Sequence, residues 1–213
     1  MRRVVLVAVM AVAGLFLQGC GDGDTAEPSP SPTASPESSG AETTPSKSSG
    51  PTGPATEGPP AESWPSDDVS QPFGGTVPPV PILVDLRVAS HAEDGYDRVV
   101  LEFDTLPGYE IGYSDDIVYD GSGEPVDLPG DAFVQLVFNP AQAHDEEGNA
   151  SLPDAPVDPV EVDFAALDAY VLNGDFEGHV SVALGVADEV GFRVGHFVAD
   201  NGNAVVYIDL ATP

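Results

Sequence analysis

The chain contains very little cysteine, tryptophan and basic residue. Its 213 residues include one Cys, one Trp and six Lys and Arg, against 36 Asp and Glu. A single cysteine excludes an intramolecular disulfide. The shortage of basic residues excludes the positive surfaces by which proteins bind nucleic acid or anionic lipid headgroups.

Long apolar runs are also scarce, and the one that stands out covers residues 4–16. A membrane span needs about 20 such residues, so this run is too short, but it suits the centre of a secretory signal that begins with Arg2 and Arg3. The letters LQGC that follow resemble a bacterial lipobox, in which the cysteine becomes the lipid-modified first residue of the mature chain. We therefore expect a signal peptide at residues 1–19, lipid attachment at Cys20 and an anchor on the outer face of the cytoplasmic membrane, rather than an ordinary secretory signal.

Residues 20–81 contain fourteen of the 22 prolines and otherwise mostly Ser, Thr, Gly, Ala and Glu. Such a composition buries too little apolar surface to offset the entropy of ordering, so we predict a disordered tether that spans the cell wall. Trp64 is an exception within it, and we expect this ring to dock on the neighbouring domain or to have no role, rather than to bind a ligand.

The remaining residues, 82–213, are long enough for one domain with a core. Three arginines against 27 Asp and Glu give this domain a formal charge of −24. That charge suits an exterior rich in divalent ions, a basic partner, or a saline habitat in which hydrated carboxylates keep the protein soluble. Solubility in salt is the first explanation, because dispersed acidic residues usually form a solvated surface.

Helical periodicity is nearly absent from this domain, whereas apolar and polar residues alternate in short runs bounded by Gly, Pro, Asn or Asp. The predicted strands are residues 82–88, 99–103, 109–113, 132–138, 160–164, 180–186, 192–198 and 204–210. Only residues 163–172 suggest a helix, and that segment is short and ambiguous. Residues 139–159 are predicted as a long polar loop. Seven or eight strands in this length predict an all-β fold, either an antiparallel β-sandwich or a flattened barrel.

The first two predicted strands are expected to form a hairpin. Their apolar faces coincide only if paired residue numbers have an odd sum, and sums of 187 or 189 put the turn near residues 93–95. A sum of 187 sets Asp85 opposite Glu102, and like charges that face each other are unfavourable. We therefore prefer 189, which sets Arg87 opposite Glu102 and His91 opposite Arg98.

Arg98 then lies on the polar face of the hairpin, and Asp97 points to the other side. Arg98 either balances nearby carboxylates at a strand edge or captures the carboxylate of a ligand, and the residues alone favour charge balance. The candidate cluster, for a ligand or for structure, consists of Arg87, His91, Asp97, Arg98 and Glu102.

The sequence offers no recognisable catalytic motif. It contains no Gly-x-Ser-x-Gly nucleophile elbow, and its four histidines lack the spacing of a zinc site. Neither catalysis nor a cofactor is therefore expected. Two acidic loops could bind calcium, one with Asp115, Asp116 and Asp120 and one at residues 145–149, but neither matches the EF-hand pattern, so both are weak candidates.

Several short motifs carry a resemblance to a known family. They are VDLR at 84–87, GYDRVVLEF at 95–103, LPGYEIGY at 106–113, GDFEG at 174–178, FRV at 192–194 and AVVYIDL at 204–210. In this order they resemble the AMIN-like domain of actinobacterial lipoproteins over residues 82–211. The family usually has an Arg at the start of its last strand, and NAVVY at 203–207 departs from that pattern.

The resemblance implies a β-sandwich related to AMIN domains, which are non-catalytic modules that target cell-wall amidases and secretin components by contact with peptidoglycan. We therefore expect a non-catalytic binding module for cell-wall polymer or an envelope protein. The alternatives are a carboxylate-dependent hydrolase of wall glycans and a calcium-dependent interaction module. Anionic wall polymers would be repelled by the acidic domain unless cations bridge them, so a basic envelope protein is also a credible partner.

Overall fold

The structure of the protein is a computed structural model that describes residues 63–213. The predicted signal peptide, the lipid attachment at Cys20 and the tether up to residue 62 lie outside the described residues. No helix within residues 63–213 has the length and hydropathy needed to cross a membrane.

Residues 63–213 form ten strands and almost no helix. The strands are β1 (Val69–Gln71), β2 (Leu83–His91), β3 (Tyr96–Phe103), β4 (Tyr109–Tyr113), β5 (Ala132–Phe138), β6 (Val160–Glu161), β7 (Leu167–Phe176), β8 (His179–Val186), β9 (Phe192–Val198) and β10 (Ala204–Ala211). A 3-10 turn, η2 (Ala92–Asp94), connects β2 to β3.

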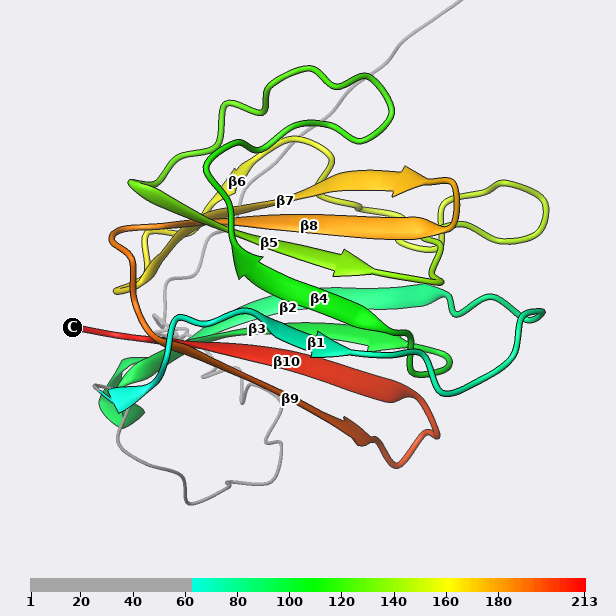
Figure 1. Ribbon diagram of the computed structural model, residues 1–213, viewed down its shortest axis with the longest axis horizontal. Coiled ribbons are helices and arrows are strands. Elements are labelled where there is room, and N and C mark those ends of the chain that lie inside the picture. The colour runs from blue at the N-terminus through cyan, green and yellow to red at the C-terminus, as the bar shows by residue number, and fades with distance from the viewer. Residues whose placement is uncertain (1–62) are drawn as a thin grey trace, which may run out of the picture. The chain divides into compact units, whose positions relative to one another are not determined.

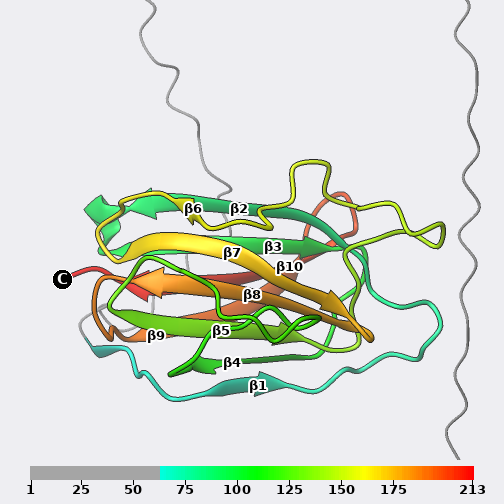
Figure 2. The same cartoon turned by 90° about the horizontal axis from the view of Figure 1, so that it is seen from above.

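The strands make two antiparallel sheets that pack face to face (Figures 1 and 2). One sheet has six strands in the order β1-β4-β5-β8-β7-β6, and the other has four in the order β2-β3-β10-β9. The predicted all-β antiparallel sandwich is therefore confirmed. The count exceeds eight because two strands were not predicted: β1, which lies in the predicted tether, and β7, whose segment is ambiguous between helix and strand.

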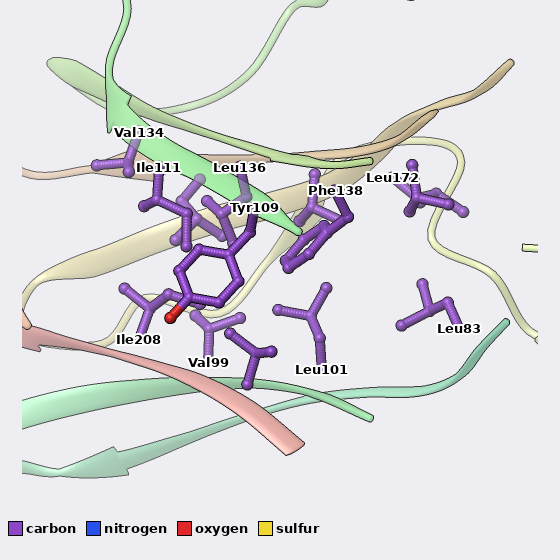
Figure 3. Packing of buried hydrophobic residues seen from close by; sticks show 14 of the residues in the cluster. Leu83, Val99, Leu101, Tyr109, Ile111, Val134, Leu136, Phe138, Leu172 and Ile208 are labelled. Atoms are coloured by element: carbon purple, nitrogen blue, oxygen red, sulfur yellow. The ribbon is translucent and has the colours of Figure 1, made fainter. Parts of the chain in front are cut away.

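The core lies between the two sheets, where alternate residues of each strand point inward (Figure 3). From β3 these are Val99, Leu101 and Phe103, all fully buried. The Phe103 ring lies 4.9 Å from the Phe138 ring of β5, so aromatic contacts join the two layers near one end of the sandwich. Burial of these large side chains supplies most of the driving force for folding.

Strand β7 covers part of the segment whose sequence is ambiguous between helix and strand. Its alternation is interrupted because the pairing with β8 shifts twice, between Leu167 and Ala169 and between Leu172 and Gly174. In addition, Ile117 from the loop after β4 belongs to a small cluster that covers the outer side of β7. A strand that is covered on both faces loses the simple alternation by which strands are recognised.

The end of the predicted tether belongs to the folded region. Strand β1 pairs with β4, so that Val69 lies opposite Ile111. Just before it, the N–H of Phe192 donates a hydrogen bond to the carbonyl oxygen of Pro65, at 2.9 Å. These main-chain contacts order residues whose composition resembles that of a linker.

The β2–β3 hairpin forms, but the preferred register is wrong. Paired residues sum to 187, so Asp85 does lie opposite Glu102. A bulge between Leu83 and Asp85 also changes which residues face the core: Leu83 is fully buried, and Val84, which was expected inside, is 37% exposed. A bulge places two residues against one and so reverses the alternation beyond it.

Candidate functional site

The candidate site is the outer sheet face, by which we mean the outward side of the four-stranded sheet. The strand registers align its side chains in rows across β2, β3, β10 and β9. The rows are Asp85, Glu102, Val205 and Phe197; Arg87, Val100, Tyr207 and Gly195; Ala89, Arg98, Asp209 and Arg193; and His91, Tyr96 and Ala211.

All three arginines of residues 63–213 lie on this face. Their charges are balanced by three carboxylates of the same rows, Asp85, Glu102 and Asp209. The outer sheet face is therefore formally neutral, although residues 82–213 as a whole carry a charge of −24. An anionic group approaching this face meets less repulsion than the overall charge of the domain implies.

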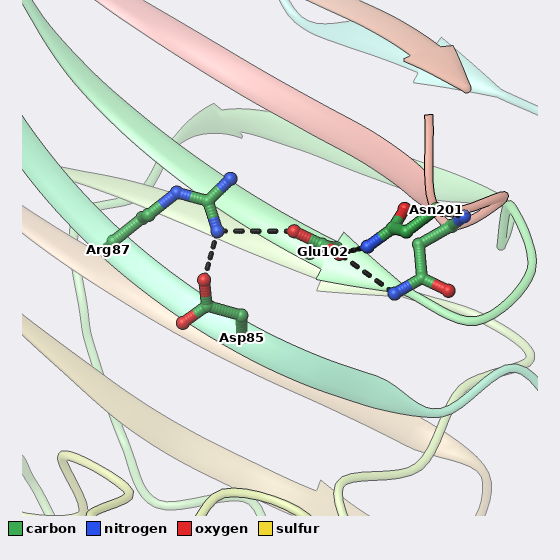
Figure 4. Close-up of polar contacts among 5 residues, drawn as sticks. Asp85, Arg87, Glu102 and Asn201 are labelled. Atoms are coloured by element: carbon green, nitrogen blue, oxygen red, sulfur yellow. Dashed lines mark hydrogen bonds and ion pairs between the residues drawn. The ribbon is translucent and has the colours of Figure 1, made fainter. Parts of the chain in front are cut away.

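One polar network on this face is centred on Glu102 (Figure 4). A guanidinium nitrogen of Arg87 contacts the carboxylate of Asp85 and lies 3.2 Å from Oε2 of Glu102. The other oxygen, Oε1, accepts hydrogen bonds from the side-chain amides of Asn201 and Asn203, each at 2.8 Å. Hydrogen bonds from Asn201 first, and then from Asn203 and Arg87, lower the pKa of Glu102 although burial raises it.

This network explains why the register places two carboxylates opposite each other. Arg87 lies between Asp85 and Glu102 and contacts both, so their mutual repulsion is compensated by one cation. The preferred register was wrong because it took account only of residues directly opposite each other. The long side chain of Arg87 also reaches Asp85, two residues away on the same strand.

The second polar network is centred on Asp209. Its carboxylate accepts two hydrogen bonds from Arg98, at 2.5 and 2.9 Å, and one from Nε of Arg193 at 2.7 Å. Asp209 is fully buried and the Arg98 side chain is only 8% exposed. Burial lowers the pKa of Arg98, but the hydrogen bond and charge of Asp209 outweigh it and raise that pKa above its usual value. Arg98 is therefore a buried charge balancer, whereas the Arg193 side chain is 28% exposed.

Aromatic rings cover the arginines of the second network. The guanidinium carbon of Arg98 lies 4.6 Å from the centre of the Tyr207 ring and 5.0 Å from that of Tyr96. The guanidinium of Arg193 lies 4.3 Å from the Trp64 ring, so the expected docking of Trp64 on the domain occurs on this face. Cation–π contacts of this kind help to hold the rings in place.

Gly195 makes room for one of these rings. A Cβ atom at this position would lie 2.4 Å from the ring of Tyr207, which is the cross-strand partner of the glycine. Because any larger residue would push the ring away, the glycine allows Tyr207 to lie across β9 and to reach Arg98.

The structure separates the predicted cluster into four parts. Arg87 and Glu102 share one network, and Arg98 belongs to the other. His91 lies opposite Tyr96 and stacks on its ring at 4.8 Å, and Ala89 takes the predicted place of His91 opposite Arg98. Asp97 points to the inner side, as expected from alternation.

Asp97 has a structural role between the two sheets. Its carboxylate accepts hydrogen bonds from the main-chain N–H groups of Ala166 and Leu167, at 2.7 and 3.3 Å. It thereby fixes the start of β7 against β3 and is not accessible to a ligand, since its side chain is fully buried.

Sequence reasoning missed Asp209, Arg193 and the two asparagines of the β9–β10 turn. The signal that could have found them is the same alternation that was used for the first hairpin. A turn near residues 199–203 pairs Arg193 with Asp209, and the observed pairing is the same. The contact of Asp209 with Arg98 requires the long-range pairing of β10 with β3, which no local pattern indicates.

The two acidic loops are the candidates for a calcium site that the sequence offers. Within residues 63–213, no group of three or more His, Cys, Asp or Glu side chains is placed so that it could hold a metal ion. The candidates Asp115, Asp116 and Asp120 lie on the loop between β4 and β5, which covers the outer side of the larger sheet. Asp120 rests against Gly174, where an added Cβ would meet its carboxylate.

The second acidic loop borders an open hollow of about 600 Å³ lined by Asp104, His144 and residues 145–148. Asp145 accepts hydrogen bonds from the main-chain N–H of Glu147 and from the main chain and side chain of Asn149. These bonds, first those of Asn149, lower the pKa of Asp145. A carboxyl group with a lowered pKa is poorly suited to donate a proton, as a glycosidase acid must.

Comparison with known proteins agrees with the fold. The family model described as AMIN-like domain matches residues 81–212, which is more than half of the chain. No curated protein and no solved structure matches the chain. From the extent of the family match we conclude that the chain belongs to the AMIN-like domain family.

Proposed function

We propose that the protein is a membrane-anchored surface lipoprotein whose β-sandwich is a non-catalytic module that binds cell-wall polymer through the outer sheet face. The AMIN-like domain suggests a binding module related to the cell wall. The lipobox-like sequence at residues 17–20 supports an anchor at Cys20, and the proline-rich residues that follow suit a tether through the wall.

The observation that carries this proposal is the concentration of all three arginines of residues 63–213 on one neutral sheet face. Wall polymers carry carboxylates on their peptide stems, and most of this domain would repel them. On the outer sheet face the partly exposed guanidiniums of Arg87 and Arg193 can pair with such carboxylates.

The aromatic rings and amides of the same face suit the sugar part of the polymer. A sugar ring presents C–H groups on its faces and hydroxyl groups around its edge. The rings of Trp64, Tyr96 and Tyr207 are partly exposed and can stack on the C–H groups. Asn201, exposed beside Glu102, can exchange hydrogen bonds with hydroxyl groups.

Sedimentation of the purified full-length protein with insoluble cell wall tests the proposal. We expect the wild-type protein to pellet with the wall and the variant Arg193→Gln to bind about tenfold more weakly, since a charge-assisted contact is lost. Phe176→Ser, an exposed change at the β7–β8 turn, is the matched control and should bind as the wild type does.

Two other outcomes of this experiment would point to a wall hydrolase or to binding that depends on cations. Release of soluble wall fragments would show a hydrolase and contradict the proposal. Loss of binding in the presence of a chelator would show that cations bridge the acidic surface to the wall. The outer sheet face supplies its own cations, so we expect binding to persist in the chelator.

A further inference from the structure

Strand β9 is the one long sheet edge of the described region that lacks the usual protection. The larger sheet ends in β1 and β6, which are only three and two residues long. The other edge of the smaller sheet, β2, carries Asp85 and Arg87 and is interrupted by a bulge. By contrast, the seven residues of β9 contain no acid, no proline and no bulge, and their one arginine, Arg193, is paired with the buried Asp209. Short length, charge and bulges are the features that keep other strands from pairing with an edge.

The main-chain groups of β9 that point away from β10 can be identified from the hydrogen bonds at its ends. The N–H of Ala199 bonds to Asn203 at 2.8 Å, and the N–H of Ala211 bonds to Gly191 at 2.9 Å. Hydrogen-bonded pairs alternate along an antiparallel ladder, so the odd-numbered residues of β9 face β10. The even-numbered residues therefore direct their N–H and C=O groups outward.

The chain itself already uses the first outward position. The N–H of Phe192 bonds to Pro65, and an extended segment thus reaches the start of the edge. At the next three outward positions, Val194, His196 and Val198, the main chain has no hydrogen-bond partner within residues 63–213. Figure 1 shows β9 at the margin of its sheet, with β10 on its other side.

We propose that β9 accepts an extended peptide segment of another protein as a fifth strand of the smaller sheet. The segment would be uncharged in the middle and basic at both ends. Its main chain bonds to the outward groups of Val194, His196 and Val198. Addition of a strand to an open edge is a recurrent mode of peptide recognition, in which main-chain bonds supply affinity and alternate side chains supply specificity.

Charge decides which occupant fits this edge. β9 itself has no acid, but Asp188 and Glu189 precede it and Asp200 follows it, all three exposed. A segment with basic ends meets these acids at both ends of the strand. An apolar residue of the segment meets Val198, the last residue of β9, which is 72% exposed.

A second copy of this chain fits the same edge poorly. In a symmetric antiparallel pair, the start of one β9 lies beside the end of the other. Asp188 and Glu189 of one copy would then face Asp200 of its partner, and two domains of charge −24 would be brought together.

The test uses the full-length protein and a synthetic probe peptide, acetyl-Lys-Thr-Val-Thr-Val-Thr-Lys-amide. We expect saturable binding, with slower hydrogen exchange at the main-chain N–H groups of Val194, His196 and Val198. Val198→Pro removes an outward N–H and should weaken binding about tenfold. The matched control Val198→Thr keeps the N–H and should bind as the wild type does. Because this side chain is exposed and its N–H points away from β10, both variants should retain the fold.

The same probe with glutamate in place of lysine should bind much more weakly if charge selects the occupant. The inference is overturned if the lysine peptide does not bind at millimolar concentration, or if binding leaves exchange along β9 unchanged. Equal binding to Val198→Pro and Val198→Thr also contradicts it. A concentration-dependent dimer that Val198→Pro abolishes would assign the edge to a second copy instead. Since Arg193→Gln leaves the outward main chain intact, loss of wall binding in that variant and loss of peptide binding in Val198→Pro are separate results.

Discussion

At the scale of single residues, Asp209 organises more of the outer sheet face than any member of the predicted cluster. It is fully buried and bonds to both Arg98 and Arg193, which belong to the strands on either side of β10. Taking charges out of water is costly, and these charges are tolerated because they are paired with short, directed hydrogen bonds. The same pairing explains why Arg98 lies in so acidic a domain.

Asp209→Asn should therefore destabilise the protein strongly. The change keeps the shape of the side chain but leaves Arg98 buried without a counter-charge, and we expect a loss of about 3 kcal/mol in the free energy of unfolding. Urea unfolding followed by tryptophan fluorescence measures it. Asp85→Asn, which changes a half-exposed partner of Arg87, should cost less than about 1 kcal/mol. Similar losses for the two variants would contradict a special role for the buried pair.

Glu102 should give a measurable dependence of stability on pH. Its pKa is lowered in the folded protein, chiefly by the hydrogen bond from Asn201. Its contribution is therefore fully present above the pKa of the unfolded state, about 4.3, and is lost as the pH falls through the folded pKa. The difference in unfolding free energy between wild type and Glu102→Gln should shrink as the pH falls below about 4. A difference that stays constant between neutral and acid pH would show that the pairing of this carboxylate contributes nothing.

At the scale of strands, the alternation of apolar and polar residues predicted the sandwich correctly, whereas the register chosen from opposed charges was wrong. Eight apolar runs were enough to predict the sandwich, because each inward face had to be covered by another sheet. The bulge at Leu83 and Asp85 and the two shifts in β7 could not be predicted, because a bulge depends on the partner strand rather than on local sequence. The network around Asp209 joins three strands and depends on the order of the sheet, which local patterns do not determine.

Strand β9 has a testable requirement for glycine at its centre. Gly195→Ala places a methyl group against the ring of Tyr207 and should displace that ring from Arg98. We expect a loss of about 1–3 kcal/mol in stability, typical of overpacking. Gly121→Ala is the matched control, because nothing lies within 4 Å of an added Cβ there. Thermal unfolding of both variants makes the comparison, and an unaffected Gly195→Ala variant would show that the ring moves aside at no cost.

At the scale of the whole molecule, the charge of −24 on residues 82–213 affects stability and the choice of partner together. Repulsion among 27 acids weakens the folded state, and it acts over a Debye length of about 10 Å at 0.1 M salt but only about 3 Å at 1 M. The melting temperature should therefore rise between about 0.05 M and about 1 M sodium chloride. A melting temperature that falls over this range would mean that attractive ion pairs outweigh the repulsion.

Binding to an anionic wall polymer requires a part of this acidic domain that does not repel it, and the outer sheet face is formally neutral. The only tryptophan of the chain, Trp64, lies on that face beside Arg193. Its fluorescence therefore reports on ligands that reach the site. Titration of the full-length protein with soluble wall fragments should give a saturable change in Trp64 emission. The affinity should fall about tenfold in Arg87→Gln, whose side chain belongs to the Glu102 network rather than to the surroundings of Trp64. An emission spectrum unchanged at millimolar fragment, or equal affinity in the variant, would contradict binding at this face.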